Sequence, residues 1–240
     1  MNSTLNYSPS FTIKKRKAKK IKFIIFHYTG MKKEKEAIER LTSMRSKVSS
    51  HYLIRYNGEI VIMVPDLYEA WHAGLSSWKN LKSLNKYSIG IEISNPGHEY
   101  DYKKFSKKQN QSLKKLSQFL IKKYKIDKKN ILGHSDVAPT RKKDPGEKFP
   151  WKKLQKNKIG IWYKKLQFKS KRLADKKVEK LFFKNLFKIG YRYFSKNRRT
   201  KNDIFLVKAF QRRFLPNSVT GIIDQKTYKI SHFLANLTKN

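Results

Sequence analysis

The chain has 240 residues, enough for one sizeable hydrophobic core and a small second domain. It contains no cysteine, which excludes disulfides, thiolate zinc sites, a cysteine nucleophile and lipid attachment through cysteine. Residues 1–20 lack the apolar stretch of a secretory signal, and no apolar run approaches the roughly 20 residues of a membrane span. We therefore expect a soluble cytoplasmic protein with no membrane partner.

The charge is strongly basic, with 57 Lys and Arg against 17 Asp and Glu and a net charge of +40. A field of this size attracts polyanions. The basic residues run from Lys14 to Lys239 without forming one stripe, as a codon bias towards AT-rich DNA would also produce. The alternative is functional attraction, either to nucleic acid or to a carboxylate-bearing cell-wall polymer, and no recognised nucleic-acid-binding motif supports the former.

The N-terminal half alternates strands and helices. After a basic N-terminal extension at residues 1–19, residues 22–26 form an apolar, strand-like run that ends at His27. Residues 34–44 carry apolar side chains near helical spacing, which predicts a helix. Two apolar runs, 51–56 and 60–64, flank an Asn-Gly turn signal and predict a β-hairpin.

The middle of the chain continues this pattern. Residues 66–86 show little periodicity and are predicted to form a long loop, a feature that often carries function. Residues 88–94 alternate strictly, which places three isoleucines on the core face and Glu92 on the other face between small neighbours. An amphipathic helix is predicted over 107–124, and a short strand over 130–133. These elements predict an α/β fold with a mixed β-sheet flanked by helices.

The sequence texture changes after Trp162. We predict one α/β domain over residues 20–164, a Lys-rich linker over 165–177, and a small all-α domain over 178–240. This last segment is at the small end of independently folding domains. The side chains expected to be buried in its two or three short helices are Leu181, Leu186, Phe187, Ile189, Ile204, Val207, Phe210 and Phe214.

Two of the predicted strands end in histidine. His27 and His134 take these positions, and Asp144 follows in a Pro/Gly-rich loop, where a scaffold often presents functional groups. A catalytic zinc site takes three protein ligands and keeps one position for water, and two histidines with one carboxylate is a common set. Each histidine alone is more simply explained as a hydrogen-bonded core or surface residue. Together we interpret the three residues as ligands of one zinc ion per chain.

Five short segments carry a family resemblance when taken in order. They are FHYT at 26–29, SHYLI at 50–54, AWHAG at 70–74, SIGIE at 88–92, and GHSD at 133–136 with KKDPG at 142–146. Over roughly residues 20–162 the chain closely resembles the zinc-dependent N-acetylmuramoyl-L-alanine amidases of the AmpD/AmiD type. Peptidoglycan recognition proteins and phage lysozyme-amidases share that fold.

The resemblance implies roles for five residues and a reaction. His27, His134 and Asp144 become the zinc ligands, Glu92 the catalytic acid/base and Lys142 the stabiliser of the oxyanion. In an extended loop Lys142 also lies on the same side as Asp144, because side chains alternate. The implied reaction is hydrolysis of the amide between N-acetylmuramic acid, ordinary or 1,6-anhydro, and L-alanine of the stem peptide. It would serve cell-wall degradation or muropeptide recycling.

The other histidines and tryptophans with a motif around them could each bind substrate or have a structural role. His51, His72 and Trp71 are candidate substrate-binding residues because the family's corresponding positions lie near the cleft, and structural packing is an equal alternative. Trp71 and Trp78 would offer apolar faces to a sugar ring or belong to the core. His98 and His232 have no motif around them.

The C-terminal segment resembles a helical peptidoglycan-binding module at residues 209–214 and 219–224, the alternative being an appendage that only packs on the catalytic domain. Such a module favours intact wall as substrate, whereas a cytoplasmic location favours recovered muropeptides. A non-catalytic peptidoglycan receptor on the same fold and a nucleic-acid-binding protein are the alternative functions. We expect a monomer that binds peptidoglycan or muropeptides and no specific nucleic acid.

Overall fold

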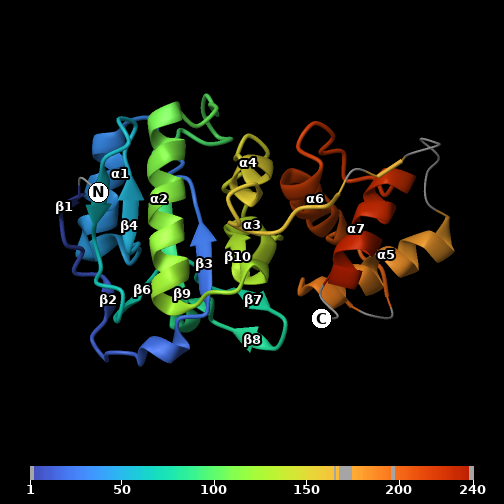
Figure 1. Ribbon diagram of the computed structural model, residues 1–240, viewed down its shortest axis with the longest axis horizontal. Helices are drawn as coiled ribbons and strands as arrows, with labels where there is room; N and C mark the ends of the chain where they lie inside the picture. The colour runs from blue at the N-terminus through green and yellow to red at the C-terminus, as the bar shows by residue number, and fades with distance from the viewer. Residues whose placement is uncertain (1–2, 165, 168–174, 196–197, 238–240) are drawn as a thin grey trace.

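The computed structural model describes residues 3–164, 166–167, 175–195 and 198–237. A layered α/β region occupies one side of the molecule, and the C-terminal helices lie beside it (Figure 1). Most of the linker predicted at 165–177 lies outside the described residues. Within the part of the chain that is described, no helix is both long and apolar enough to cross a membrane.

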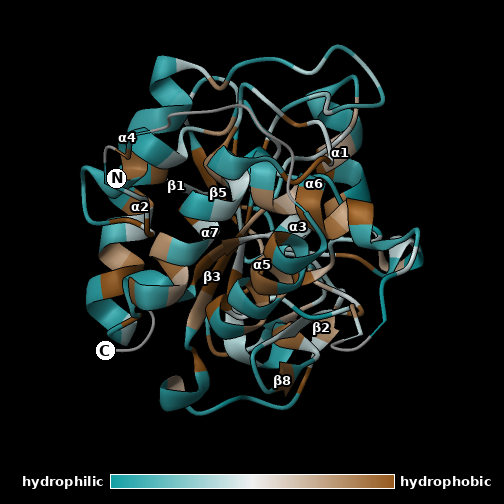
Figure 2. Ribbon diagram, turned by 90° about the vertical axis from the view of Figure 1, so that its right-hand side faces the viewer, coloured by the Kyte–Doolittle hydropathy of each residue, from teal (hydrophilic) through white to brown (hydrophobic). Residues whose placement is uncertain are grey.

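A six-stranded mixed sheet forms the centre of the α/β region, as predicted. In spatial order its strands are β1 (Ser3–Leu5), β5 (Ile60–Ile62), β4 (Tyr52–Ile54), β9 (Ser88–Ile93), β3 (Phe23–Phe26) and β10 (Ile131–Gly133). Among the described strands of this sheet, β4 and β5 form the one antiparallel pair. Strands β3 and β10 are buried along their whole length, which explains their continuous apolar sequences. Figure 2 shows β3 as a hydrophobic strand within the molecule.

Two helices flank the sheet. Helix α2 (Lys107–Tyr124) begins at a capping box made by Ser106 and Gln109, and its leucines pack against the isoleucines of β9. Helix α1 (Glu34–Thr42) places Leu41 against Leu53 of β4 and neighbouring apolar residues. Both helices agree with the periodicity of the sequence.

The connections contain several short elements. These are β2 (Phe11–Thr12), η1 (Ala18–Lys20), η2 (Met44–Ser46), β6 (Glu69–Ala70), β7 (Ser77–Trp78), β8 (Leu81–Lys82), η3 (Leu84–Tyr87), η4 (Lys128–Asn130), α3 (His134–Val137) and α4 (Trp151–Gln155). The segment 66–86, expected as a loop, thus holds three two-residue strands and a 3₁₀ turn.

The segment before residue 20 is tied into the α/β region. Strand β1 adds an edge to the sheet by pairing with β5. Arg16 is buried, and its guanidinium donates to the backbone oxygens of Asp66 and Asn85. This segment therefore helps to hold the loop 66–86 in place.

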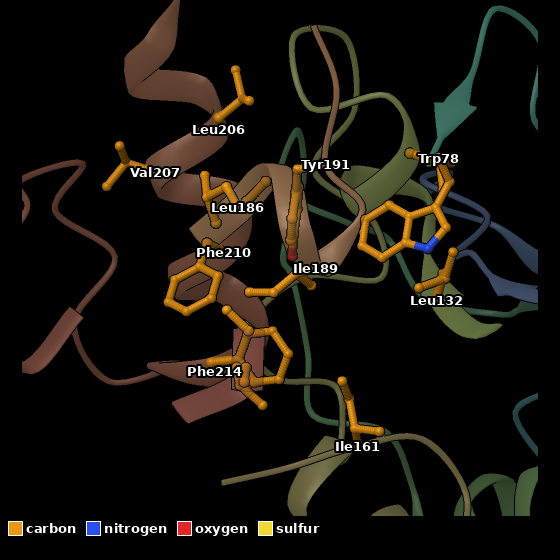
Figure 3. Close-up of a cluster of buried hydrophobic side chains, with 14 of the residues drawn as sticks. Trp78, Leu132, Ile161, Leu186, Ile189, Tyr191, Leu206, Val207, Phe210 and Phe214 are labelled. Carbon is orange, nitrogen blue, oxygen red and sulfur yellow. The ribbon is translucent and has the colours of Figure 1, made fainter. Parts of the chain in front are cut away.

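The described part of the C-terminal region contains three helices, within the predicted two or three: α5 (Lys176–Ile189), α6 (Asp203–Phe214) and α7 (Gln225–Leu237). Their apolar faces share one continuous cluster with residues of β3, β7 and β10, part of which Figure 3 shows around Tyr191 and Trp78. The expectation for Ile204 was wrong, because its side chain is 40% exposed at the start of α6. In α5 the buried positions include Phe182 and Phe183, next to the predicted Leu181.

Candidate active site

Strand register brings three functional side chains to one edge of the sheet. Phe26 pairs with Gly133 of β10 on one side and with Ile91 of β9 on the other. The residues that follow, His27, His134 and Glu92, therefore sit on three neighbouring strands or just beyond their carboxyl ends. Open α/β sheets bind ligands at this edge.

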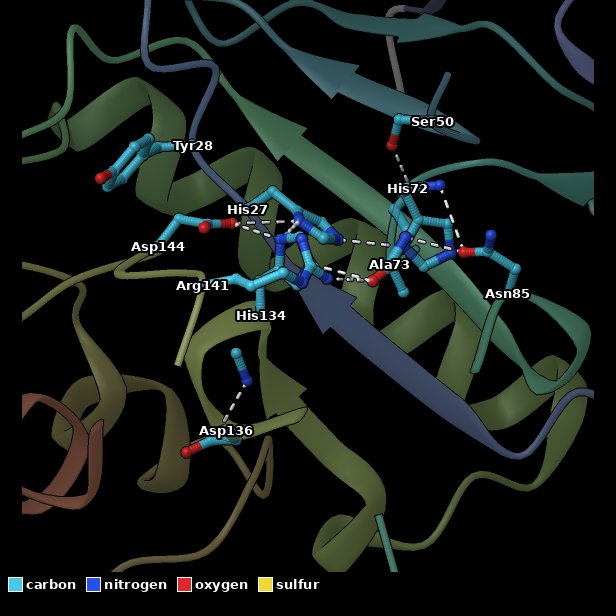
Figure 4. Close-up of polar contacts among 12 residues, drawn as sticks. His27, Tyr28, Ser50, His72, Ala73, Asn85, His134, Asp136, Arg141 and Asp144 are labelled. Atoms are coloured by element: carbon cyan, nitrogen blue, oxygen red, sulfur yellow. Dashed lines mark hydrogen bonds and ion pairs between the residues drawn. The ribbon is translucent and has the colours of Figure 1, made fainter. Parts of the chain in front are cut away.

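His27, His134 and Asp144 meet at a single point (Figure 4). The Nδ1 atoms of the two histidines are 3.0 Å apart, and each lies 3.1 Å from Oδ2 of Asp144. All three residues are buried. Zinc–nitrogen bonds of about 2.0–2.1 Å in a tetrahedral site place ligand atoms roughly 3.3 Å apart, so this spacing fits zinc.

A chain of hydrogen bonds sets the tautomer of His27. Ser88 donates its hydroxyl proton to the backbone oxygen of Leu84 at 2.6 Å, so its Oγ accepts from Nε2 of His72 at 3.1 Å. Nδ1 of His72 then carries no proton and accepts from Nε2 of His27 at 3.0 Å. As a result Nδ1 of His27 presents a lone pair. Metal-binding histidines are commonly oriented through the second ring nitrogen in this way.

His134 is oriented similarly, because its Nε2 faces the backbone oxygen of Ala73 at 3.2 Å. Its Nδ1 is then also a lone pair. Two imidazole lone pairs and a carboxylate converge without a proton donor between them, an arrangement that a cation stabilises. The donor set of two nitrogens and one oxygen is one that zinc accepts.

The pKa shifts of His27 and Asp144 favour the protonation states that bind a metal, which are a neutral imidazole and an ionised carboxylate. Burial, and then the neighbouring His134, lower the pKa of His27 to about 4, so it is neutral at pH 7. Burial alone would raise the pKa of Asp144, but the positive charge and hydrogen bond that His134 supplies when it is protonated, and then those of His27, outweigh burial and hold that pKa well below its usual range. His27 and Asp144 therefore have few protons to lose before they could bind a metal.

Glu92 faces the same site without a partner. Its Oε2 is buried and makes no hydrogen bond to any residue that the structure describes. Burial, with a further contribution from Asp144, raises the pKa of Glu92 to about 8. A carboxyl group with a pKa near neutrality, aimed into a pocket, has the properties of a general acid/base.

The pocket around these residues has a volume of about 370 Å³ and fits a small ligand. Its wall is rich in positive charge, from Arg40, Arg141, Lys142 and Lys143. Lys142 is half-buried and its charge lowers the pKa of both His27 and Glu92. Lys143 is exposed and pairs with Glu99 at 3.1 Å.

Residues 17–147, more than half of the chain, match the family model described as N-acetylmuramoyl-L-alanine amidase. The chain belongs to this amidase family. AmiD of Escherichia coli is 39% identical over 155 residues, which cover 60% of this chain and 55% of that protein. The chain thus spans about half the length of the curated relatives it matches.

Solved structures of the family resemble the chain over most of its length. The E. coli AmiD complex with anhydro-N-acetylmuramic acid-L-Ala-D-γ-Glu-L-Lys superposes with a TM-score of 0.81 at 31% identity, covering 91% of this chain and 90% of that one. AmpDh3 from Pseudomonas aeruginosa gives a TM-score of 0.81 at 28% identity and covers 99% of both chains. The similarity includes the C-terminal helices, since they fall within the matched length.

The candidate substrate-binding residues lie in different places. Trp71 and His72 line the pocket, and the indole nitrogen of Trp71 donates to Oγ1 of Thr12. His51 is fully buried and does not line the pocket; its Nδ1 accepts from the backbone N–H of Gly90 at 3.0 Å. Burial, and then Arg16, lower the pKa of His51 to about 3. His51 therefore lies outside the pocket that Trp71 and His72 line.

Trp78 belongs to the core and not to the pocket, because it is 1% exposed and its ring packs edge-on against Tyr191. His98, for which no role was predicted, bridges Tyr28 at the pocket wall and Glu147. Asn85, also missed, accepts from the backbone N–H groups of His72 and Ala73. Neither residue stands in a recognisable pattern, and only the folded chain brings them to the site.

The chain of hydrogen bonds through His72 predicts a loss of metal affinity on substitution. In His72→Phe the ring shape is kept but the acceptor for His27 is lost, so we expect zinc affinity to fall about 10- to 100-fold. His72→Asn, whose side-chain oxygen lies near the Nδ1 position, should lose less. Titration against a competing chelator measures both. Equal affinity in His72→Phe and the unaltered protein would show that His72 does not orient His27.

Proposed function

We propose that the chain is a zinc-dependent N-acetylmuramoyl-L-alanine amidase. The proposed substrate bond is the amide between N-acetylmuramic acid and L-alanine of the stem peptide. One observation carries this proposal: three acceptor atoms that suit a metal ion converge within a pocket that also holds Glu92, one of whose carboxyl oxygens is buried and makes no hydrogen bond to the described residues. Family membership points to the same chemistry.

His27, His134 and Asp144 would hold the zinc. When bound, zinc supplies a Lewis acid that lowers the pKa of water towards about 7 and polarises a carbonyl oxygen. The chain's own contribution at this point is orientation: both imidazoles have their second nitrogen bound, so each ligand atom is fixed before the metal arrives.

Glu92 would take a proton from the attacking water and return it to the leaving amine of L-alanine. Its carboxylate must be ionised for the first step. The charge of Lys142 favours that form, and so does any cation held by the neighbouring ligands. After the first proton transfer the group is a carboxylic acid with a pKa near neutrality, ready to protonate the amine.

Lys142 would stabilise the negative charge that develops on the carbonyl oxygen. We expect Lys142→Met to lower kcat about 10²- to 10³-fold with zinc content unchanged, as for the loss of one oxyanion donor. The acid limb of the pH profile should also move to higher pH, because Lys142 lowers the pKa of Glu92. Lys143→Met is the matched control, because the side chain of Lys143 forms an ion pair with Glu99 and not with His27, Glu92 or Asp144. Equal losses of kcat in the two variants would show that Lys142 contributes only a general positive charge and does not stabilise the oxyanion.

The pocket's positive wall supports a substrate that carries carboxylates. The peptide in the AmiD complex contains a γ-linked glutamate, and γ-linkage leaves the α-carboxylate of that residue free. Arg40 and Arg141 line the pocket, and their charges would attract such groups. We propose muropeptides, in the ordinary or 1,6-anhydro form, as substrates in the cytoplasm, and a monomer as the active species.

For the C-terminal helices we propose peptidoglycan binding, supported by the resemblance at residues 209–214 and 219–224. Intact wall is then a second substrate. Sedimentation of the full chain with purified sacculi tests this binding, and sacculi stripped of stem peptides separate recognition of glycan from recognition of peptide.

Mass spectrometry of products tests the reaction. Zinc-loaded protein is incubated with purified muropeptides and, separately, with sacculi, each beside a chelated control. We expect release of an intact stem peptide that begins with L-alanine, abolished by chelation and restored by zinc. Binding without cleavage, at one zinc per chain, would instead support a non-catalytic peptidoglycan receptor.

A further inference from the structure

A buried carboxylate stands directly behind the metal ligand His134. Asp136 is 1% exposed, and its Oδ2 accepts from the backbone N–H of Gly133 at 2.8 Å (Figure 4). That bond closes the turn in which helix α3 begins with His134. The position of the ligand therefore depends on where Asp136 is held.

The side chains that hold Asp136 come from the C-terminal region. The hydroxyl of Tyr191 donates to Oδ1, and Nη1 of Arg213 forms an ion pair with Oδ2, each at 2.5 Å. Both partners are buried. They lie 55 and 77 positions along the chain from Asp136. Among the hydrogen bonds of the described residues, Gly133 is the only partner of Asp136 from the α/β region.

Arg213 also binds strand β10, which leads to His134. Its Nη2 donates to the backbone oxygen of Ile131, the first residue of β10, at 2.9 Å. Its guanidinium lies 4.3 Å from the ring centroid of Trp151 in the α/β region. One arginine of α6 thus binds both the start of β10 and the helix that follows it.

Helix α3 is connected to a second ligand as well. The backbone N–H of Ser135 donates to the backbone oxygen of Asp144 at 2.8 Å. A shift of this short helix would therefore displace His134 directly and Asp144 through its backbone. Ligand atoms that lie 3.0 to 3.1 Å apart leave little tolerance for such a shift.

We propose that Asp136, Tyr191 and Arg213 form a positioning cluster through which the C-terminal helices set the zinc affinity of the site. The C-terminal region then has a role at the metal centre in addition to any contact with the cell wall. The inference depends on one part of the proposed function, namely that the site binds zinc. A buried carboxylate is stabilised only when hydrogen-bond donors or cations lie next to it. Without the C-terminal helices, Asp136 would lose the hydrogen bond from Tyr191 and the ion pair with Arg213.

The test uses the full chain and measures zinc affinity by competition with a chromogenic chelator. Tyr191→Phe removes one hydroxyl group and keeps the ring in the core. We expect zinc to dissociate about 10-fold more readily, at the lower end of the effect of altered outer-shell partners. The absorption spectrum of the cobalt-substituted protein should also change, because it reports ligand geometry. Tyr228→Phe, in the same hydrophobic cluster on α7, is the matched control and should change neither.

Asp136→Asn is the stronger variant, with an expected loss of about 10- to 100-fold in zinc affinity. If it does not fold, Tyr191→Phe decides the question. Unchanged zinc affinity and cobalt spectrum in Tyr191→Phe, with only a lower melting temperature, would overturn the proposal and leave the cluster as a link between the two regions. Failure of the unaltered protein to bind zinc would contradict the proposed function instead, so the two failures are distinguishable.

Discussion

Glu92→Gln is expected to lower kcat about 10²- to 10⁴-fold while zinc affinity stays unchanged. The loss follows from removing a general acid/base, and glutamine has nearly the same shape but cannot accept and return a proton. Zinc should be retained because Glu92 is not among the three converging ligands. Product release measured by mass spectrometry, together with zinc content after dialysis, checks both parts.

Glu99→Gln is the matched control for this experiment. Glu99 lines the same pocket, but its carboxylate pairs with Lys143. We expect its replacement to change kcat less than about threefold, as for an exposed charge outside the chemistry. Full turnover in Glu92→Gln would remove Glu92 from the mechanism. Loss of zinc in that variant would make it a ligand.

The same substitution should stabilise the metal-free protein at alkaline pH. The pKa of Glu92 is raised to about 8 in the folded chain, above its ordinary value of about 4.5, so between these values the folded state holds more protons than the unfolded state. Stability therefore falls as pH rises through this range. Glutamine does not titrate, and we expect metal-free Glu92→Gln to be more stable at pH 8 by roughly 4 kcal/mol, with little difference at pH 4. Thermal unfolding at the two pH values measures this, and a variant destabilised at pH 8 would contradict it.

The position of the site was predictable because buried strands have recognisable sequence patterns, either continuous apolar runs or strict apolar/polar alternation. Apolar runs that end in histidine predicted β3 and β10, and strict alternation predicted that the three isoleucines of β9 lie on one buried face and Glu92 on the other. Parallel strands in a compact domain end at a common edge, so residues at their ends meet. Sequence spacing alone says nothing of the 3.0 Å between His27 and His134, which depends on the register of β3 with β10.

The surroundings of the site were less predictable. The small neighbours of Glu92 on β9 do not leave open space, because the ring of His72 lies so close to Gly90 that a Cβ there would be 2.4 Å from it. His72 comes from a segment without periodicity, so no local pattern shows where its side chain points. The pairing of Asp136 with Arg213 likewise joins residues 77 positions apart. Ile204 has an apolar side chain at a helical spacing but lies in the first turn of α6, where it meets solvent.

Asp144→Asn is expected to weaken zinc binding about 10²- to 10³-fold. Zinc sites with four protein ligands bind with about 10–16 kcal/mol, or roughly 2.5–4 kcal/mol per ligand, and asparagine also lacks the negative charge. Turnover at one equivalent of zinc should be lost with it and return in part at excess zinc. Asp101→Asn is the control, because that carboxylate forms an exposed ion pair with Lys103. Undiminished affinity in Asp144→Asn would mean that Asp144 is not a ligand.

The pH dependence of zinc binding separates this site from two ordinary imidazoles. At pH 5.5 a free histidine with a pKa near 6.5 is about 90% protonated, so two of them would release nearly two protons on binding. His27, whose pKa is lowered to about 4, is already neutral at this pH, and Asp144 is already ionised. We therefore expect at most about one proton to be released at pH 5.5, measured by calorimetry in buffers of different ionisation enthalpy. Release close to two protons would show that His27 is protonated in the metal-free protein and that its burial does not prepare it for zinc.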